Sequence, residues 1–132
     1  MDLVFVDSCV LIYAMEEDPQ FGQAARQALS TAWANRQTVA ISPLVQLECL
    51  VHPLSRQQAD LVARYQDWLR QFQWLPINDT TFALATELRA KHKLKTPDAL
   101  HLATALQHQC VALISNDKRL ERANTNLQCL SL

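Results

Sequence analysis

Glycine is almost absent from this chain, and its scarcity excludes several kinds of binding site. The 132 residues contain one glycine, Gly22. Phosphate-binding loops of the G-x-G-x-x-G and G-x-x-x-x-G-K types need at least two glycines, because the backbone must turn tightly and approach the phosphates closely. The sequence therefore predicts neither a dinucleotide-binding loop nor a P-loop.

The cysteines lack the spacing of a zinc site or a redox pair. Cys9, Cys49, Cys110 and Cys129 form no C-x-x-C pair, and each lies in an apolar run. We therefore expect reduced, mostly buried thiols. The first residues, MDLVFVDS, carry acids at positions 2 and 7, which is unlike a signal peptide or a membrane span. These features predict a cytoplasmic protein without a membrane segment.

The chain also lacks an excess of charge of either sign. Its formal net charge is −1, with 49% hydrophobic and 19% charged residues. This composition is typical of a folded globular chain, and overall charge does not indicate a nucleic-acid partner. There is no internal repeat, low-complexity tract or linker. We therefore expect a single domain over residues 1–132.

Short apolar runs alternate with helix-forming segments, a pattern that predicts an α/β fold with a parallel sheet. The predicted strands are residues 3–6, 38–41, 74–77, 111–115 and 127–132. The predicted helices are residues 9–15, 20–35, 44–51, 55–72, 82–93, 98–109 and 117–123. The expected helix N-caps are Asp7 or Ser8, Ser42, Asp79 or Thr80, and Thr96.

Four acids occupy positions where such a fold builds a site. Asp7 follows the first predicted strand and Asp117 follows the fourth. Glu48 lies within an apolar helix, and Asp98 lies in the first turn of another, directly after Pro97. Because ligands of open parallel sheets bind beyond the carboxyl ends of the strands, Asp7 and Asp117 point to the expected site.

Each acid also has a purely structural interpretation. Asp7 and Asp117 can cap the helices that follow them, and Asp98 can interact favourably with a helix N-terminus. Glu48 fits such an interpretation least well, because a carboxylate among apolar neighbours needs a partner, a metal or the wet edge of its helix.

Taken as a set, the four acids predict a site for a hard divalent cation. Gathered carboxylates repel one another, and Mg²⁺ or Mn²⁺ removes that penalty by accepting oxygen ligands. Zinc does not fit, since His and Cys are not arranged to bind it. A bound cation of this kind can activate water and neutralise charge on a phosphodiester.

The segments that carry these acids are VFVDSCVLIY, SPLVQLECL, TPDALHLATA and LISNDKRL. They resemble, in order, the four acidic motifs of the PIN-domain family, and TPDALHLATA is the most specific of them. Their spacing over nearly the whole chain resembles the VapC-type toxins of bacterial toxin–antitoxin pairs. The resemblance implies a three-layer α/β/α sandwich with a short parallel sheet flanked by helices. It also implies an Mg²⁺- or Mn²⁺-dependent endoribonuclease, a homodimer and a cognate antitoxin.

The resemblance makes Asp7, Glu48, Asp98 and Asp117 the catalytic residues and metal ligands. Three polar neighbours, Ser8, Asn116 and His101, are candidates for orienting these ligands. Each has an alternative: Ser8 as a helix cap, Asn116 as a turn residue, and His101 as a structural core histidine. Cys9 departs from the family pattern, because many relatives carry asparagine or serine there.

Basic residues near the acids are candidates for binding RNA phosphates. They are Arg89, Lys91, Lys93, Lys95 and Lys118, with Arg119 and Arg122 extending the same rim. The alternative for the first group is a solvated helix end with cations near its C-terminus. The tryptophans Trp33, Trp68 and Trp74 are interpreted as core or interface residues rather than as platforms for bases.

Two other functions compete with the nuclease hypothesis. Asp7 could be the nucleophile of an aspartate-based phosphohydrolase, but those enzymes carry D-x-D where this chain reads Asp7-Ser8-Cys9. The chain could also be a catalytically inactive PIN-like module that binds RNA. Metal-dependent RNA cleavage distinguishes the enzyme from the binding module.

Overall fold

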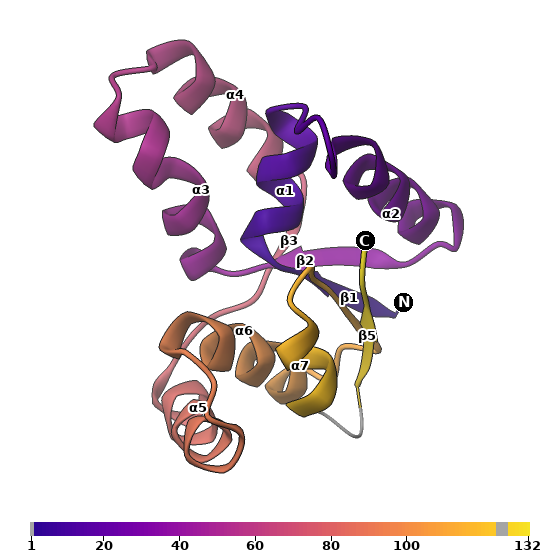
Figure 1. Cartoon of the computed structure of the whole chain (residues 1–132), viewed down its shortest axis with the longest axis vertical. Helices are drawn as coiled ribbons and strands as arrows, with labels where there is room; N and C mark the ends of the chain where they lie inside the picture. The colour runs from indigo at the N-terminus through magenta and orange to yellow at the C-terminus, as the bar shows by residue number, and fades with distance from the viewer. Residues whose placement is uncertain (1, 124–126) are drawn as a thin grey trace.

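A parallel β-sheet forms the centre of the computed structural model, which describes residues 2–123 and 127–132. Its strands are β1 (Leu3–Val6), β2 (Thr38–Ile41), β3 (Gln73–Trp74), β4 (Ala112–Ile114) and β5 (Gln128–Leu130). Every pairing is parallel, and the strand order is β3-β2-β1-β4-β5. The sheet runs through the middle of the molecule, with helices above and below it (Figure 1).

Helices cover both faces of this sheet. They are α1 (Ser8–Met15), α2 (Gly22–Ala34), α3 (Pro43–Ser55), α4 (Ala59–Leu69), α5 (Asp79–His92), α6 (Thr96–Gln107) and α7 (Lys118–Ala123). Helices α1 to α4 lie on one side of the sheet, and α5, α6 and α7 lie on the other (Figure 1). The predicted three-layer α/β/α arrangement is therefore confirmed.

The order of the strands creates a switch point between β1 and β4. From β1 the chain moves outward through β2 to β3 with its connecting helices on one face, and then returns over the other face to β4. The backbone N–H of Asp7 donates to the carbonyl oxygen of Ile114 at 3.0 Å, so the ends of β1 and β4 lie together. Ligands of doubly wound sheets bind at such a point.

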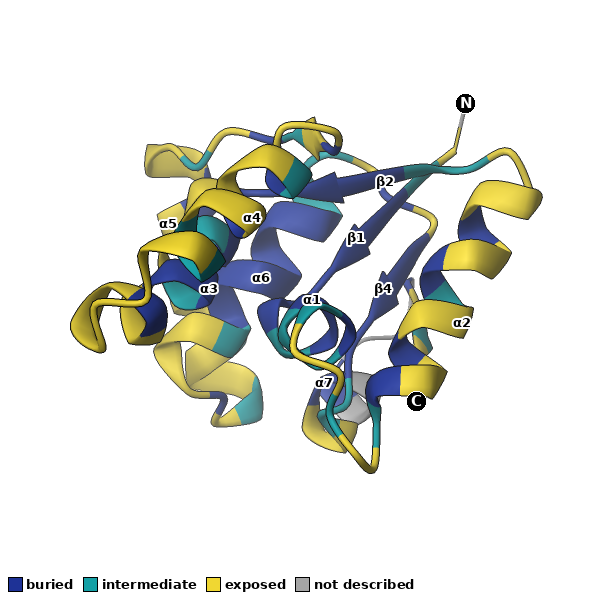
Figure 2. Ribbon diagram, turned by 90° about the horizontal axis from the view of Figure 1, so that it is seen from above, coloured by how far each residue is buried: buried dark blue, intermediate teal, exposed yellow. Residues whose placement is uncertain are grey.

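The strands supply most of the core. Val4, Phe5, Val6 and Leu113 have no exposed surface, which agrees with short apolar strands buried on both faces. The helices are buried toward the sheet and exposed on their outer sides (Figure 2). Burial at the centre of the sheet fixes the strand ends, and with them the side chains that follow each strand. No helix in the described part of the chain could span a membrane.

Helix α3 is longer than the sequence predicts. It begins as expected, with the Ser42 hydroxyl accepting from the Val45 N–H at 3.4 Å and Pro43 in the first turn. It continues through Pro53 to Ser55, so the prediction of a break before residue 55 is wrong. The break lies at Gln57, which adopts a left-handed conformation with φ of 57°, and α4 therefore begins only at Ala59.

Two other predicted helix starts are also wrong. Asn78, rather than Asp79 or Thr80, caps α5, because its side chain and that of Thr81 satisfy each other's backbone N–H groups in a capping box. Thr96 is the first residue of α6 and not its cap, and its hydroxyl accepts from Arg89.

Most other elements are shorter than their apolar patterns. Strand β3 ends at Trp74 rather than at residue 77, since Pro76 has no N–H to donate to a ladder. Strands β4 and β5 cover 112–114 and 128–130. Helix α2 covers 22–34, and α7 begins at Lys118. The sequence predicts the existence of these elements better than their ends.

Candidate active site

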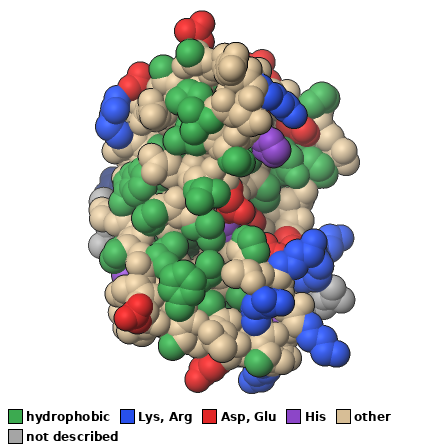
Figure 3. Space-filling view, turned by 90° about the vertical axis from the view of Figure 1, so that its left-hand side faces the viewer, with side chains coloured by type: hydrophobic (Ala, Val, Ile, Leu, Met, Phe, Trp, Pro, Cys, Tyr) green, Lys and Arg blue, Asp and Glu red, His purple; other side chains and the backbone are tan. Residues whose placement is uncertain are grey.

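The four acids singled out from the sequence line one cleft at the switch point of the sheet. The cleft has a volume of about 460 Å³, and the residues around it are Asp7, Ser8, Cys9, Tyr13, Glu48, Asp98, Asn116, Asp117 and Arg119. Acidic side chains gather near the middle of this face of the molecule, with basic side chains to one side of them (Figure 3). The structure therefore brings together carboxylates from four separate segments.

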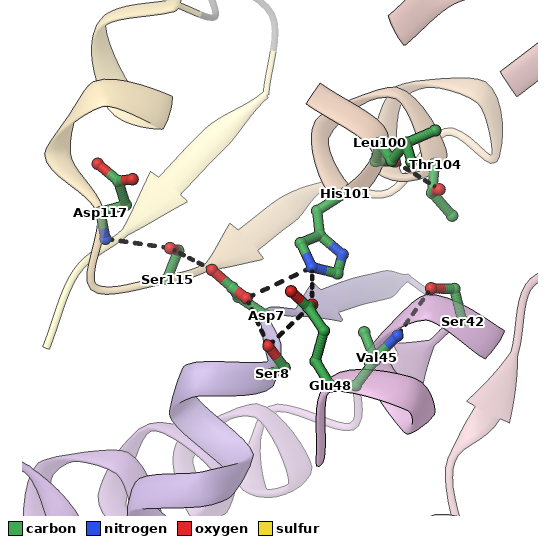
Figure 4. A network of polar contacts seen from close by, with 10 residues as sticks. All are labelled: Asp7, Ser8, Ser42, Val45, Glu48, Leu100, His101, Thr104, Ser115 and Asp117. Carbon is green, nitrogen blue, oxygen red and sulfur yellow. Dashed lines mark hydrogen bonds and ion pairs between the residues drawn. The ribbon is translucent and has the colours of Figure 1, made fainter. Parts of the chain in front are cut away.

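Asp7 is buried at the end of β1, and its side chain does not cap α1. Asp7 occupies the N-cap position of α1, but its carboxylate makes no capping hydrogen bond. Instead it accepts from the Ser115 hydroxyl at 2.9 Å and lies 3.3 Å from the Ser8 hydroxyl (Figure 4). The capping interpretation is thus wrong for the Asp7 side chain, which faces the cleft.

Glu48 points from α3 toward α6 and is held there by two partners. Its Oε1 lies 2.6 Å from His101 Nε2 and accepts from the Ser8 hydroxyl at 3.0 Å (Figure 4). Burial raises the pKa of Glu48, but the hydrogen bond and charge of His101 outweigh burial, and the pKa falls below its usual value. Glu48 therefore remains ionised at neutral pH.

His101 is buried behind the carboxylates, with only 1% of its surface exposed. Its Nε2 lies 3.6 Å from Asp7 in addition to its short contact with Glu48. Burial lowers the pKa of His101, but the Glu48 hydrogen bond and the negative charges of Asp7 and Glu48 raise it overall. Its Nδ1 is buried and has no hydrogen-bond partner in the part of the chain that the structure describes. The ring is thus placed to orient two carboxylates.

Ser115 is a member of the site that the sequence analysis missed. Its hydroxyl donates to Asp7 and accepts from the backbone N–H of Asp117 at 3.1 Å (Figure 4). It thereby connects the ends of β1 and β4. The sequence feature that could have identified Ser115 is its position as the first residue after β4, at the same edge of the sheet as Asp7.

Asp117 has both a structural contact and a place in the cleft. Its Oδ1 accepts from the backbone N–H of Arg119 at 2.9 Å, so the capping interpretation is right for this residue. The Arg119 guanidinium also contacts both carboxylate oxygens, at 3.3 and 3.4 Å. Burial raises the pKa of Asp117, but the hydrogen bonds and charge of Arg119 lower it overall.

Asp98 lies at the start of α6, where its surroundings disfavour the charged form of its carboxyl group. Burial raises its pKa first, and the negative charges of Asp117 and Asp7 raise it further. His101 and Arg119 act in the opposite direction without cancelling this effect. A favourable helix N-terminus alone would lower the pKa of this carboxyl group, so the interaction with the helix does not decide its state.

The donor atoms of the cleft suit a hard divalent cation. Asp7, Glu48 and His101 each offer one ligand atom, and these three atoms lie within 4.8 Å of one another. Carboxylate oxygens dominate the set, as Mg²⁺ and Mn²⁺ prefer. A cation would also relieve the repulsion that raises the pKa of Asp98.

Cys9 also lines the cleft but presents a thiol rather than a thiolate. Burial first, and then the charge of Asp7, raise the pKa of Cys9 to about 12.

The predicted RNA-binding residues differ in how free their side chains are. Lys91, Lys93, Lys95 and Lys118 are exposed. Arg89 donates to the Leu94 carbonyl and the Thr96 hydroxyl, both at 2.8 Å, and so stabilises the connection between α5 and α6. The side chain of Arg122 lies outside the described residues.

None of the three tryptophans lines the acidic cleft. Trp68 packs edge-on against Phe72, and Trp74 donates to the Leu69 carbonyl oxygen at 2.9 Å. Trp33 also packs against Phe72, although about half of its surface is exposed. These contacts agree with core or interface roles.

A doubly wound parallel sheet with converging carboxylates at its switch point defines an α/β domain built around an acidic cleft. The model of the PIN domain family matches residues 4–126. The chain belongs to this family, whose members are nucleases. A comparison with curated protein sequences finds no match.

Several solved structures share the fold. A toxin–antitoxin complex from Klebsiella pneumoniae is 29% identical over 87% of each chain, with a TM-score of 0.73. VapBC2 from Rickettsia felis, bound to a DNA fragment from its promoter, is 18% identical over 98% of each chain, with a TM-score of 0.78. VapC20 from Mycobacterium tuberculosis, a toxin that cleaves the sarcin–ricin loop, is 14% identical over 95% of this chain and 98% of its own, with a TM-score of 0.75.

Proposed function

We propose that this protein is a metal-dependent endoribonuclease and the toxin of a toxin–antitoxin pair. The observation that carries the proposal is the convergence of Asp7, Glu48, Asp98 and Asp117 on one cleft beyond the ends of β1 and β4. The similarity to toxin–antitoxin complexes supports the biological setting, and the RNA-cleaving relative supports the substrate class.

In this proposal the four carboxylates hold Mg²⁺ or Mn²⁺. When bound, the cation supplies Lewis acidity toward water and the phosphodiester. The chain's own polar residues fix the ligands: Ser115 and Ser8 orient Asp7, while His101 and Ser8 orient Glu48. Asn116 lines the cleft beside Asp117. Because these partners are themselves buried, Asp7 and Glu48 are held in position before a cation binds.

RNA would approach across the basic side of the cleft. Lys91, Lys93, Lys95 and Lys118 are exposed and free to contact phosphates. We assign Arg89 a weaker part, because its guanidinium already donates to Leu94 and Thr96. Contacts of this kind bind the phosphates of the RNA backbone and not the bases. They therefore favour RNA over a neutral substrate but do not select a nucleotide sequence.

A homodimer and an antitoxin are the proposed protein partners. The exposed face of α3 carries Leu47, Val51 and Leu54, with 59%, 48% and 60% of their surfaces exposed. With the half-buried Leu44 they repeat every three and four residues, which is the spacing of a helix–helix contact. We assign this α3 stripe to the homodimer. An apolar row of this length is seldom left in water.

The deciding experiment is cleavage of structured and single-stranded RNA by the purified chain with Mg²⁺ or Mn²⁺. We expect cleavage that stops in excess EDTA, and a loss of at least about 100-fold in Asp98→Asn, since a ligand that acts in the transition state is removed. Asp60→Asn is the matched control, because Asp60 also lies in the first turn of a helix but outside the cleft. Cleavage that persists in EDTA would refute the metal mechanism.

The same preparation separates the two alternative functions. An inactive binding module would retain RNA without cleaving it at any concentration of Mn²⁺. An aspartate-based phosphohydrolase would form a phosphoaspartate at Asp7, which acid quenching and mass measurement detect. The hydrogen bonds from Ser8 and Ser115 to both oxygens of Asp7 favour a fixed ligand over an attacking nucleophile.

A further inference from the structure

Arg119 is the only basic side chain among the described residues that line the acidic cleft. Its Nε lies 3.3 Å from Asp117 Oδ1, and one of its terminal nitrogens lies 3.4 Å from Oδ2. Both carboxylate oxygens are therefore covered by one guanidinium, as in a forked pair. The arrangement puts a positive charge in the cleft that the four carboxylates line.

Asp117 remains anchored even without this guanidinium. Its Oδ1 accepts from the backbone N–H of Arg119, and its own backbone N–H donates to Ser115. The side chain of Arg119 is 52% exposed, so its guanidinium is accessible to solvent. The ion pair can therefore open while the position of Asp117 is retained.

The effect of Arg119 extends to the second acid of this part of the cleft. Asp98, Asp117 and Arg119 line the same cleft, so the guanidinium lies on the side where these two carboxylates face each other. Lys118, the adjacent residue, is exposed and forms no ion pair among the described residues. Among the described residues of α7, Arg119 is therefore the one whose positive charge lies in the cleft.

We propose that Arg119 is a built-in counter-ion of the Asp98–Asp117 side of the cleft and that a divalent cation competes with its guanidinium for Asp117. The inference rests on the proposed function, because it assumes that these acids bind a cation. If Asp117 turned its oxygens to a bound cation, the exposed guanidinium would be released at the mouth of the cleft. There it can contact a phosphodiester oxygen, since guanidinium binds phosphate in the same forked geometry.

Competition of this kind has a measurable sign. If Arg119 competes with the cation, removing the guanidinium should tighten cation binding. If Arg119 only helped to build the site, removing it should weaken cation binding. We expect Arg119→Gln to bind Mn²⁺ about fivefold or more tightly than the wild type in calorimetric titration without RNA, because the charge that is lost contacts both oxygens of Asp117 directly. Lys118→Gln removes the same charge one residue away and should stay within about twofold of the wild type.

A second variant tests geometry as well as charge. Arg119→Lys keeps a cation but loses the fork, so its Mn²⁺ affinity should lie between those of the wild type and Arg119→Gln. In ¹H–¹⁵N spectra, the Nε–H signal of Arg119, identified by its loss in the glutamine variant, should shift with Mg²⁺ at the concentration that saturates the site. Thermal unfolding in EDTA checks that all variants are folded.

Three outcomes would overturn the inference: equal Mn²⁺ affinity in Arg119→Gln and Lys118→Gln, weaker binding in Arg119→Gln, or no binding by any of the proteins. The result is independent of catalysis. Tighter binding in Arg119→Gln together with a wild type that cleaves no RNA would support the counter-ion and reject the nuclease. Metal-dependent RNA cleavage by the wild type, together with an Mn²⁺ affinity that is unchanged in Arg119→Gln, would support the nuclease and reject the counter-ion.

Discussion

His101 Nε2 lies 2.6 Å from Glu48 Oε1, although 53 residues separate the two in sequence. The contact joins α6 to α3 across the end of the sheet, directly beside Asp7. It places a buried histidine behind two proposed metal ligands, where its charge and hydrogen bond stabilise the ionised carboxylates.

Replacing His101 with glutamine should destabilise the metal-free protein more at pH 6 than at pH 9. The pKa of His101 is raised in the folded state, so its protonated form contributes stability that is fully present below the unfolded pKa of about 6.5. That contribution is lost as pH rises through the folded pKa. Glu48, whose pKa is lowered, stays ionised over this whole range.

The measurement is the melting temperature of both proteins in EDTA across this range. A charge-assisted hydrogen bond of this kind contributes about 1.5–3 kcal/mol, and each kcal/mol moves the Tm of a chain of this size by roughly 3–5 °C. Loss of ring packing against Phe5 is independent of pH and cancels in the comparison. An identical Tm difference at both pH values would contradict the prediction. In Glu48→Gln, the Tm difference caused by replacing His101 should depend less on pH.

Asp98→Asn should raise the Tm of the metal-free protein at pH 7. The charged form of Asp98 is disfavoured by burial and by the carboxylates of Asp117 and Asp7, so a neutral amide of the same shape relieves the repulsion. The gain should shrink as pH falls through the raised pKa of Asp98, where the wild-type carboxyl group is protonated as well. Stabilisation by Mn²⁺ should also decrease.

Asp60→Asn is again the control, because Asp60 lies in the first turn of α4. It should lose only a favourable helix-terminus interaction, which is about 0.3–1 kcal/mol. If Asp98→Asn lowers the Tm in EDTA as Asp60→Asn does, Asp98 is a helix-terminus residue and the repulsive cluster is refuted.

Charges introduced on the α3 stripe should convert the proposed homodimer to a monomer. Leu47 and Leu54 are both more than half exposed, so replacing them with lysine costs little in the isolated chain but places charges inside a helix–helix contact. Sedimentation of Leu47→Lys/Leu54→Lys at tens of micromolar should show a monomer with an unchanged Tm. Val111→Lys alters an exposed apolar residue outside the stripe and should leave the mass unchanged. A wild-type monomer would remove the dimer proposal.

Gly22→Ala should destabilise the fold by roughly 1–3 kcal/mol, the usual cost of inserting a methyl group into a tightly packed position. A Cβ at this position would lie 3.1 Å from the backbone oxygen of Tyr13 and 3.1 Å from the backbone carbon of Glu17. Backbone atoms cannot rotate away as a side chain would. Gln23→Ala, on the exposed side of the same helix, should be close to neutral in urea unfolding.

Three of the four thiols should react slowly in the native protein. Burial, together with nearby negative charge at Cys9 and Cys49, raises the pKa of both thiols to about 12, and burial raises that of Cys110 to about 11. Few thiolates therefore exist at pH 8. Colour development with a disulfide reagent should be slow in Cys129→Ser and become fast in urea. Rapid release from the native variant would contradict the burial of these residues.

The sequence by itself determined the class of the fold and the positions of the four acids. Short apolar runs such as residues 3–6, alternating with helical segments, predict strands of a covered parallel sheet, and the acids that follow β1 and β4 then lie at its carboxyl edge. The Ser42–Pro43 pair likewise fixed the start of α3, because a cap depends only on residues within one turn.

Tertiary structure decided which partner each acid has. The contact of Ser115 with Asp7 spans 108 residues, and that of Ser8 with Glu48 spans 40. No local pattern specifies such pairs, since they depend on the order of the strands and on how α3 and α6 pack on opposite faces. The forked contact of Arg119 with Asp117 is different, because it joins residues two positions apart in the same turn, and only its place in the cleft depends on the packing of β4 against β1. Local sequence determines periodicity and caps, whereas the chemistry of this site arises from contacts that exist only after the sheet has formed.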